Sequence, residues 1–276
     1  MEYKRILTIQ DISCVGQCSL TVALPILSAC GMETIILPSA ILSTHTAGFT
    51  GFTFRDLTDD IDKITDHWAK ENIFFDTLYT GYLGSIDQID KVIRIADTRL
   101  KEGAPVIVDP AMADNGVLYS IFNLEFVKNM KRLCDKADVI LPNITEACFL
   151  TGTEYKETYD EAYILDLVKK LAVSDDQTVV LTGVSYKNDT TGVVVYKAGD
   201  LQYYEHEKIE QGCHGTGDVY ASAFVGAFMN DKTAYEAAAI AADYTVACIK
   251  NTQGDKDHWY GVKFEPVLGQ LINSLQ

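Results

Sequence analysis

Short apolar runs rich in β-branched residues alternate along this chain with longer segments of helical periodicity, and this alternation constrains the fold more than any other feature. The runs lack the in–out pattern of a strand with one solvated face, which indicates strands buried on both sides. Such an alternation predicts an α/β fold of three layers (αβα), with a mostly parallel central sheet covered by helices. The predicted strands are 5–10, 34–38, 77–81, 105–110, 138–143 and 178–183.

The segment 192–207 breaks this rhythm, because it reads as a β-hairpin with Gly199 and Asp200 in its turn. No repeat, linker or low-complexity stretch interrupts the 276 residues, so we expect a single domain, residues 1–276. The predicted helices lie near 18–30, 57–71, 85–101, 122–135, 145–151, 158–172, 217–229, 233–250 and 264–274.

The charge of the chain excludes some partners. Lys and Arg total 23 against 39 for Asp and Glu, a formal net charge of −16, which argues against nucleic acid or an anionic membrane as a ligand. The seven cysteines form no CxxC pair and lie mostly in apolar runs. These features predict a protein of the reducing cytoplasm with buried thiols, and no segment is expected to span a membrane.

Polar residues stand at the ends of five predicted strands. In open parallel sheets ligands bind outside the carboxyl ends of the strands, so these residues are expected to share one site. Asn143 and Glu146 also fit a capping box, which is the structural alternative for that pair. The five strand ends are Gln10-Asp11, Gly81 to Ser85, Asp109, Asn143 with Glu146, and Thr182-Gly183.

The stretch HGTGD, residues 214–218, places Gly215, Thr216 and Gly217 at a predicted helix start, directly before Asp218. A glycine-rich helix start offers backbone N–H groups to an anion. Asp218 is then either an acidic first-turn residue that suits the helix dipole, or a general base beside an anion hole. Phosphoryl transfer requires both an anion hole and a group that positions the acceptor.

HGTGD is similar to the GxGD signature of the ribokinase-like (PfkB) superfamily. Through nearly the whole chain, the ordered motifs IQD, THT, GYLGS, VDPAM, LPNITE and HGTGD resemble the pyridoxal kinase branch. The resemblance implies a ribokinase-like domain with small flap segments rather than a separate lid domain, usually forming a homodimer. It also implies transfer of a phosphoryl group from MgATP to the 5′-hydroxymethyl group of pyridoxal, pyridoxine or pyridoxamine, in the salvage of pyridoxal 5′-phosphate.

The resemblance also implies roles for individual residues. Asp218 is the general base, and Gly215, Thr216 and Gly217 shape the anion hole. The remaining implied contacts are Asp11, Thr46 and Tyr82 on the pyridine ring, and Asp109, Asn143, Glu146 and Thr182 along ATP.

Asp109 and Glu146 are further expected near Mg²⁺, with Glu146 acting through water, as hard cations prefer oxygen ligands and retain waters. The sequence leaves open whether a monovalent cation takes part. The adenine pocket is expected between segment 206–217 and the helix near 233–250, although no motif fixes its residues.

The chain departs from the family pattern at several positions. Asp11 stands where many pyridoxal kinases carry Ser, and Gly183 where some bacterial relatives carry Lys. Lys187 either compensates for that missing charge or is a solvated loop lysine. A divergent subgroup uses a lid cysteine and a GTGC motif; this chain has GTGD and no cysteine between 49 and 133, so no hemithioacetal is expected.

The segment 43–56 is predicted to be a flap, because Gly48 and Gly51 suit a loop that moves and then covers an apolar ring. The alternative is a surface loop packed on one side. His45 within it either touches substrate or is a structural histidine. Residues 113–116 are a second candidate lid segment.

Two other functions remain open from the sequence. A hydroxymethylpyrimidine kinase would share the fold, the base and the anion hole, and only the ring pocket would differ. A nucleotide-binding regulator with a decayed site is the alternative outside enzymes, although intact Asp218 and Asp109 argue against it. A sugar kinase and a Rossmann oxidoreductase are poorly supported, because the chain lacks an early Gly-Gly motif and a GxGxxG after the first strand.

Overall fold

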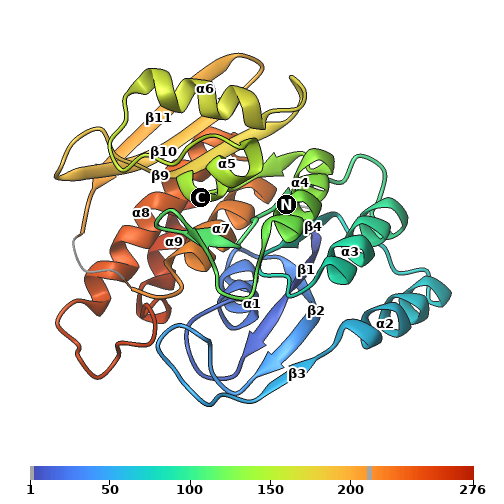
Figure 1. Ribbon diagram of the computed structural model, residues 1–276. Coiled ribbons are helices and arrows are strands. Elements are labelled where there is room, and N and C mark those ends of the chain that lie inside the picture. The colour runs from blue at the N-terminus through green and yellow to red at the C-terminus, as the bar shows by residue number, and fades with distance from the viewer. Residues whose placement is uncertain (1–2, 210–212) are drawn as a thin grey trace.

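The computed structural model describes residues 3–209 and 213–276, and its centre is one large sheet (Figure 1). The strand order within these residues is β11-β10-β9-β8-β5-β4-β1-β2-β3. The central strands run parallel, as their apolar character on both faces predicts. They are β1 (Arg5–Ser13), β2 (Glu33–Leu42), β4 (Thr77–Thr80), β5 (Val106–Val108), β8 (Val139–Ile140) and β9 (Thr178–Val184).

Both edges of the sheet end in antiparallel strands. At one edge β3 (Phe54–Asp56) pairs with β2, and at the other β10 (Thr190–Lys197) and β11 (Asp200–Glu207) form the predicted hairpin. The predicted turn residues were wrong by one position, because Lys197 pairs with Asp200 and leaves Ala198 and Gly199 in the turn. Both turn residues have positive φ, 50° and 85°, which is the twist that a two-residue hairpin turn needs.

Helices cover both faces of the sheet, so the three-layer fold is confirmed. The side chains of β1 point alternately to the two faces of the sheet. Ile6 packs into the hydrophobic core on one face, and Leu7 and Ile9 pack into the core on the other face. One layer contains α2 (Thr58–Lys70), α3 (Ile86–Arg99), α4 (Leu124–Lys136), α5 (Ile144–Thr151) and α6 (Glu161–Leu171). The other contains α1 (Leu20–Ala29), α7 (Thr216–Met229), α8 (Ala234–Thr252), the 3₁₀ turn η1 (Glu265–Val267) and α9 (Leu268–Ser274).

Helix α7 lies at the centre of its layer and carries the HGTGD stretch at its start. Every residue from Val219 to Ala227 is buried, in keeping with a sequence that is apolar on all sides. Gly226 allows α1 to approach closely, because a Cβ there would lie 2.4 Å from the Sγ of Cys30. This close packing holds α7 against α1.

Two short segments flank that edge. Residues 43–53 form the loop between β2 and β3, so the flap predicted over 43–56 is wrong for its last three residues, which pair with β2 as a strand. The loop includes Gly48 and Gly51 with φ of 91° and 69°. The second candidate lid is a small hairpin, β6 (Ala113–Asp114) and β7 (Val117–Leu118). Across the described residues, no helix is both long and apolar enough to cross a membrane.

Candidate functional site

The predicted site residues meet at the carboxyl edge of the parallel strands. Asp11 lies near the carboxyl end of β1, while Asp109 directly follows β5. Electrostatic interactions connect the members of the site: Asp218 interacts with Asp11 and Asp109, and Asp109 also interacts with Glu146. Thr182 joins the same edge through a bridge to Asn143. The structure therefore brings together residues from five strand ends and the start of α7.

The start of α7 has the geometry of an anion site. Gly215 adopts the left-handed conformation (φ 80°), and a Cβ there would lie 1.6 Å from the carbonyl oxygen of Gln17, so only glycine fits. Among the described residues, no side chain caps this helix start. The hydroxyl of Thr216 instead donates to the Cys213 carbonyl at 3.3 Å. The first-turn N–H groups are thus available to a phosphate.

Asp218 lies in that first turn and is partly exposed. Desolvation by the surrounding atoms raises its pKa from 3.8 to about 7, and the backbone N–H of Ser19 acts in the opposite direction. The nearby Asp11 carboxylate also raises this pKa. A carboxylate with a pKa near neutral suits a general base, because it is ionised at working pH yet basic enough to take a proton.

Asp109 and Glu146 form a pair of buried carboxyl groups. Burial and the neighbouring charge of Glu146 raise the pKa of Asp109 well above its usual value. Burial likewise raises the pKa of Glu146 to about 7, although backbone N–H groups, two of them at hydrogen-bond distance, oppose that shift. These donors are Met112 N–H at 3.0 Å and Asn143 N–H at 2.9 Å, one to each carboxylate oxygen.

Both polar atoms of the Asn143 side chain make hydrogen bonds within the protein. Its side-chain oxygen accepts from Glu146 N–H at 2.9 Å, which completes the predicted capping box of α5. Its amide nitrogen donates to the Ala113 carbonyl at 2.9 Å. The side chain therefore ties α5 to the 113–118 hairpin, and any effect on ATP acts through the position of Glu146 and this hairpin.

The carboxyl pair fits a divalent cation bound with phosphates. No lysine or arginine is among the main influences on either carboxyl group in the described residues. A hard cation would supply the missing positive charge, and each oxygen of Glu146 keeps a free lone pair for a metal-bound water. No cluster of three or more potential ligands is preformed within residues 3–209 and 213–276, so phosphate oxygens and waters would complete the coordination.

Asp11 and Tyr82 lie together in another part of the site. Asp11 is 5% exposed, and its oxygens accept from the hydroxyls of Ser13 at 3.0 Å and Ser19 at 2.6 Å. Burial raises the pKa of Asp11, and these two hydroxyls oppose the shift. Burial raises the pKa of Tyr82 to about 12, and the nearby charge of Asp11 contributes to this shift. Thr46 is exposed in the loop 43–53.

His45 is a structural histidine. Its Nδ1 accepts from Ala47 N–H at 3.1 Å, so the proton is on Nε2, which donates to the Tyr260 carbonyl at 2.6 Å. Both ring nitrogens are used, and the side chain is 4% exposed. His45 therefore anchors the loop 43–53 to the C-terminal part of the chain.

The segment around Trp259 is a part of the site that sequence reasoning missed. Trp259 packs against Phe49, with ring centroids 4.7 Å apart. A Cβ on Gly48 would lie 2.8 Å from the Trp259 ring, so the loop 43–53 rests directly on it. The only sequence signal was an adjacent Trp-Tyr pair in an otherwise polar stretch, DKDHWYG.

Of the two alternatives for Lys187, the structure supports the solvated loop lysine. It is exposed and pairs with Glu205 of the hairpin, at 2.9 and 3.0 Å from the two carboxylate oxygens. Gly183 has a φ of 75° at the end of β9, a conformation that suits glycine. Lys187 is therefore not assigned to replace the lysine that some relatives carry at the position of Gly183.

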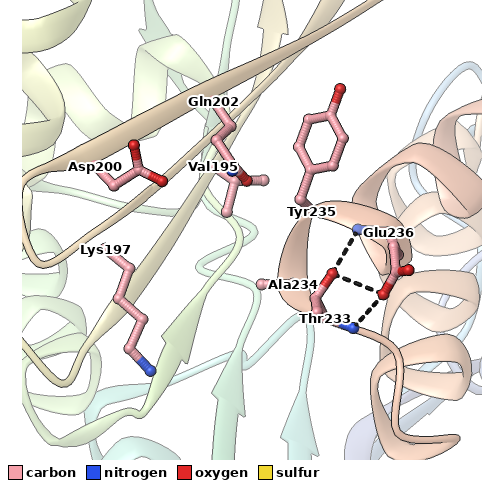
Figure 2. Close-up of a pocket in the computed structure, with 8 residues that line it drawn as sticks. All are labelled: Val195, Lys197, Asp200, Gln202, Thr233, Ala234, Tyr235 and Glu236. Carbon is pink, nitrogen blue, oxygen red and sulfur yellow. Dashed lines mark hydrogen bonds between the residues drawn. The ribbon is translucent and has the colours of Figure 1, made fainter.

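A cavity of about 460 Å³ lies elsewhere, between the hairpin and the first turn of α8 (Figure 2). Tyr196 pairs with Val179 near the start of β9, which places this end of the hairpin at the amino edge of the sheet. The cavity is therefore not the expected adenine pocket, part of which, 210–212, lies outside the described residues. Its lining residues are Val195, Lys197, Asp200, Gln202, Thr233, Ala234, Tyr235 and Glu236.

Comparisons with known proteins identify the family to which this chain belongs. The family model for phosphomethylpyrimidine kinase matches residues 26–262. A pyridoxal kinase of Dictyostelium discoideum is 28% identical over 248 residues, which cover 83% of this chain and 80% of that protein. The crystal structure of pyridoxal kinase from Lactobacillus plantarum is 30% identical with a TM-score of 0.91, covering 99% of this chain and 98% of that one.

A crystal structure from Bacteroides thetaiotaomicron, described as a candidate phosphomethylpyrimidine kinase and solved with pyridoxal, is also similar. It is 36% identical with a TM-score of 0.91, and the match covers 98% of this chain and 96% of that chain. The match to pyridoxal kinases and to the phosphomethylpyrimidine kinase family thus extends over nearly the whole chain.

Proposed function

Because the chain belongs to the phosphomethylpyrimidine kinase family, we propose that it is an ATP-dependent kinase that phosphorylates the 5′-hydroxymethyl group of B6 vitamers. The observation that carries this proposal is Asp218, a carboxylate with a pKa near 7 in the first turn of an uncapped, glycine-initiated helix. The similarity to pyridoxal kinases over almost the entire chain supports the choice of substrate.

Asp218 would take the proton of the acceptor hydroxyl as it attacks the γ-phosphate. The first-turn N–H groups of α7, shaped by Gly215, Thr216 and Gly217, would hold the charge of the transferred group. The start of α7 would thus serve both reactants, with its backbone N–H groups toward the phosphate and its first acidic side chain toward the alcohol. This division of tasks explains why an anion site carries its own carboxylate.

Asp109 and Glu146 would hold a magnesium ion through water, and this ion screens the phosphate charge when it is bound. Thr182 and the 113–118 hairpin lie along the same edge and would face the nucleotide. The pyridine ring would lie between Asp11 and Tyr82, with Thr46 reaching it from the loop 43–53.

A second candidate function is hydroxymethylpyrimidine kinase. The family description and that of the Bacteroides thetaiotaomicron structure both favour it, although the latter was solved with pyridoxal. The fold, the base and the anion hole would be the same for both substrates, so the pocket around the ring determines which substrate is used.

The proposal includes a homodimer in a reducing cytoplasm. The dimer rests on the family resemblance. All seven cysteines, each of them in the described part of the chain, are free thiols, which is consistent with a reducing compartment. The net charge of −16 argues against nucleic acid or an anionic membrane as a partner.

A phosphorylation screen tests the proposed function. Pyridoxal, pyridoxine, pyridoxamine and hydroxymethylpyrimidine are each incubated with MgATP, and the phosphate ester is detected directly so that ATP hydrolysis is not counted as transfer. We expect transfer to the B6 vitamers, with Asp218→Asn as the inactive control. Transfer to hydroxymethylpyrimidine alone would favour the second candidate, and ATP binding without transfer would favour a regulator.

A further inference from the structure

The C-terminal loop, residues 255–263 after α8, is closed by its own hydrogen bonds. The Asp255 carboxylate accepts from the backbone N–H of His258 at 3.2 Å, and it pairs with Lys263 at the other end of the loop. The backbone N–H of Lys263 donates to the buried hydroxyl of Thr252, at the end of α8, at 2.8 Å. These contacts give the loop a fixed shape and attach it to α8.

Two neighbouring residues of the C-terminal loop contact the loop 43–53. Trp259 packs against Phe49, with ring centroids 4.7 Å apart. The Tyr260 carbonyl accepts from Nε2 of His45 at 2.6 Å. An aromatic contact and a hydrogen bond therefore hold the loop 43–53 on either side of the threonine that is assigned to the vitamer ring.

The next two residues of the C-terminal loop contact the start of α7 and the turn beside it. The backbone N–H of Val262 donates at 3.1 Å to the carbonyl of His214, the residue before the glycine that begins α7. Gly261 lies against the turn between β1 and α1, because a Cβ there would lie 2.6 Å from the Cβ of Gln17. The C-terminal loop therefore joins the loop 43–53 to the anion site.

We propose that Trp259 is a positioning residue that determines where the loop 43–53 holds Thr46 relative to Asp218. Trp259 contacts this loop next to Gly48, where a Cβ would lie 2.8 Å from the indole ring. Glycine gives a loop backbone wide conformational freedom, and packing against a ring restricts that freedom. This inference rests on the proposed function, because Thr46 meets a vitamer only if the protein is a kinase of that class.

Trp259→Ala should raise the KM for the vitamer by about ten-fold, as expected when an aromatic contact is lost. The KM for ATP should stay near the wild-type value. We expect kcat to stay within about three-fold of the wild-type value, because neither Asp218 nor the start of α7 is altered. Trp259 is 48% exposed, so its replacement leaves the hydrophobic core intact.

Two further variants separate positioning from a general effect of losing a surface ring. Trp259→Phe keeps a ring that can pack against Phe49, so it should recover most of the wild-type vitamer KM. Phe74→Ala is the matched control, since Phe74 is 37% exposed and precedes β4 at the amino edge of the sheet. It should leave kcat and both KM values unaltered. An equal rise in vitamer KM in Trp259→Ala and Phe74→Ala would overturn the proposal.

Cleavage by chymotrypsin measures how firmly the loop is held without reference to activity. Phe49 and Phe52 are the residues of the loop 43–53 that this protease recognises. In the ligand-free protein, cleavage there should be about ten-fold faster in Trp259→Ala than in the wild type, because a loop opens more often when fewer contacts hold it. Trp259→Phe and Phe74→Ala should be cleaved there at the wild-type rate. Mass spectrometry assigns each cleavage, since the substitutions at 259 and 74 alter other sites of the protease.

The two proposals fail in different ways. If the wild-type protein phosphorylates none of the vitamers, the proposed function is wrong, and the cleavage rates still decide whether Trp259 holds the loop. If vitamers are phosphorylated but the vitamer KM or the cleavage rate is the same in Trp259→Ala and the wild type, the proposed function stands and the role of Trp259 is overturned.

Discussion

Single carboxyl groups in this site derive their chemistry from burial among other carboxyl groups. Asp218, Asp109 and Glu146 all have raised pKa values, with desolvation as the main cause in each case. Asp11, held by two serine hydroxyls, adds a fourth negative group nearby. Ligands that bring positive charge stabilise the ionised carboxylates of such a site most strongly. A cation bound with ATP and an amine-bearing vitamer would both bring such charge.

Asp218→Asn should lower kcat by about 10²–10⁴, the usual contribution of a general base. The asparagine is nearly isosteric but cannot take the proton. The affinity for ATP, measured by nucleotide binding in the absence of vitamer, should change little because the N–H groups of α7 remain. Retention of near wild-type turnover would remove Asp218 from the mechanism.

Asp11 is predicted to favour pyridoxamine over pyridoxal. Its oxygens accept from Ser13 and Ser19, and each keeps a lone pair for a ligand. The cationic aminomethyl group of pyridoxamine can donate to it, and a charge-assisted hydrogen bond of this kind is worth roughly 1.5–3 kcal/mol, or about one to two decades in affinity. The ionised ring hydroxyl of pyridoxal would instead be repelled.

The measurement is kcat/KM for both vitamers in the wild-type protein and in Asp11→Ser. Serine keeps an acceptor for the Ser19 hydroxyl while it removes the charge, so the preference should narrow or invert. An identical ratio of kcat/KM values in both proteins would show that Asp11 does not discriminate between the vitamers.

At the scale of elements, two helix starts build the site by different means. The start of α5 is closed by its own capping box, and the capping glutamate then faces Asp109. The start of α7 is left open, and a glycine in the left-handed conformation brings it against the β1–α1 turn. A closed start can position a metal-binding carboxylate, and an open start can bind an anion.

Glu146→Gln should raise the Mg²⁺ concentration needed for half-maximal activity by about 10–100-fold, the usual cost of altering a group that acts through a metal-bound ligand. Glutamine retains the capping box of α5, so the charge is the main difference. The KM for the vitamer is the internal control and should stay near the wild-type value. An unchanged Mg²⁺ titration would leave Glu146 with only its role as a helix cap.

Gly215→Ala should abolish the anion site. A Cβ there would meet the Gln17 carbonyl at 1.6 Å, and φ is 80°, so the first turn of α7 must move. We expect a loss of kcat of about 10²–10³, comparable to removing one donor of an oxyanion hole, together with a lower melting temperature.

Gly217→Ala is the matched control for stability. Nothing lies within 4 Å of a Cβ at position 217, and the residue is helical, so alanine should maintain or raise the melting temperature. Equal melting temperatures for Gly215→Ala and the wild-type protein would show that the close approach to Gln17 is not required.

At the scale of the whole molecule, the fold concentrates negative charge at one edge of the sheet. Several surface carboxylates elsewhere have basic partners, such as Asp231 with Lys4 and Glu205 with Lys187, and the pKa values of these two are lowered. The site carboxylates lack such partners within the described residues and have raised values. The site is therefore a region where ionisation opposes folding.

The stability of the ligand-free protein should fall as the pH rises from about 5 to about 8. Asp218 and Glu146 have a folded-state pKa of about 7, above their usual 3.8 and 4.5. Between these values the folded protein keeps protons that the unfolded chain has released. The stability that each group contributes is therefore fully present below its usual pKa, and it is lost as the pH rises through about 7.

Melting temperatures across this range check the prediction, with Glu146→Gln as the comparison, since a neutral side chain should make the decline shallower. The partnered surface carboxylates do not interfere, because they are ionised in both states throughout the range. A melting temperature that rises with pH, or an identical slope in the variant, would contradict the assignment.

The sequence by itself determined the elements and the edge at which they place the site. Continuous apolar runs predicted the buried parallel strands, and the hairpin, the capping box of Asn143 and the glycine-initiated helix before Asp218 were all found. These features depend on residues close together in the chain, whose backbone preferences and hydrogen bonds are local. The turn of the hairpin was off by one position because Ala198, a residue without a turn preference, occupies it.

Only the tertiary structure decided which side chains meet. The His45 contact with Tyr260 joins residues 215 positions apart, and no local pattern encodes it. The contact of Trp259 with the loop 43–53 and the hydrogen bond from Ser19 to Asp11 likewise arise from packing. Ser19 directly precedes α1, yet its hydroxyl donates to Asp11 instead of capping the helix, because a buried carboxylate needs the donors within its reach.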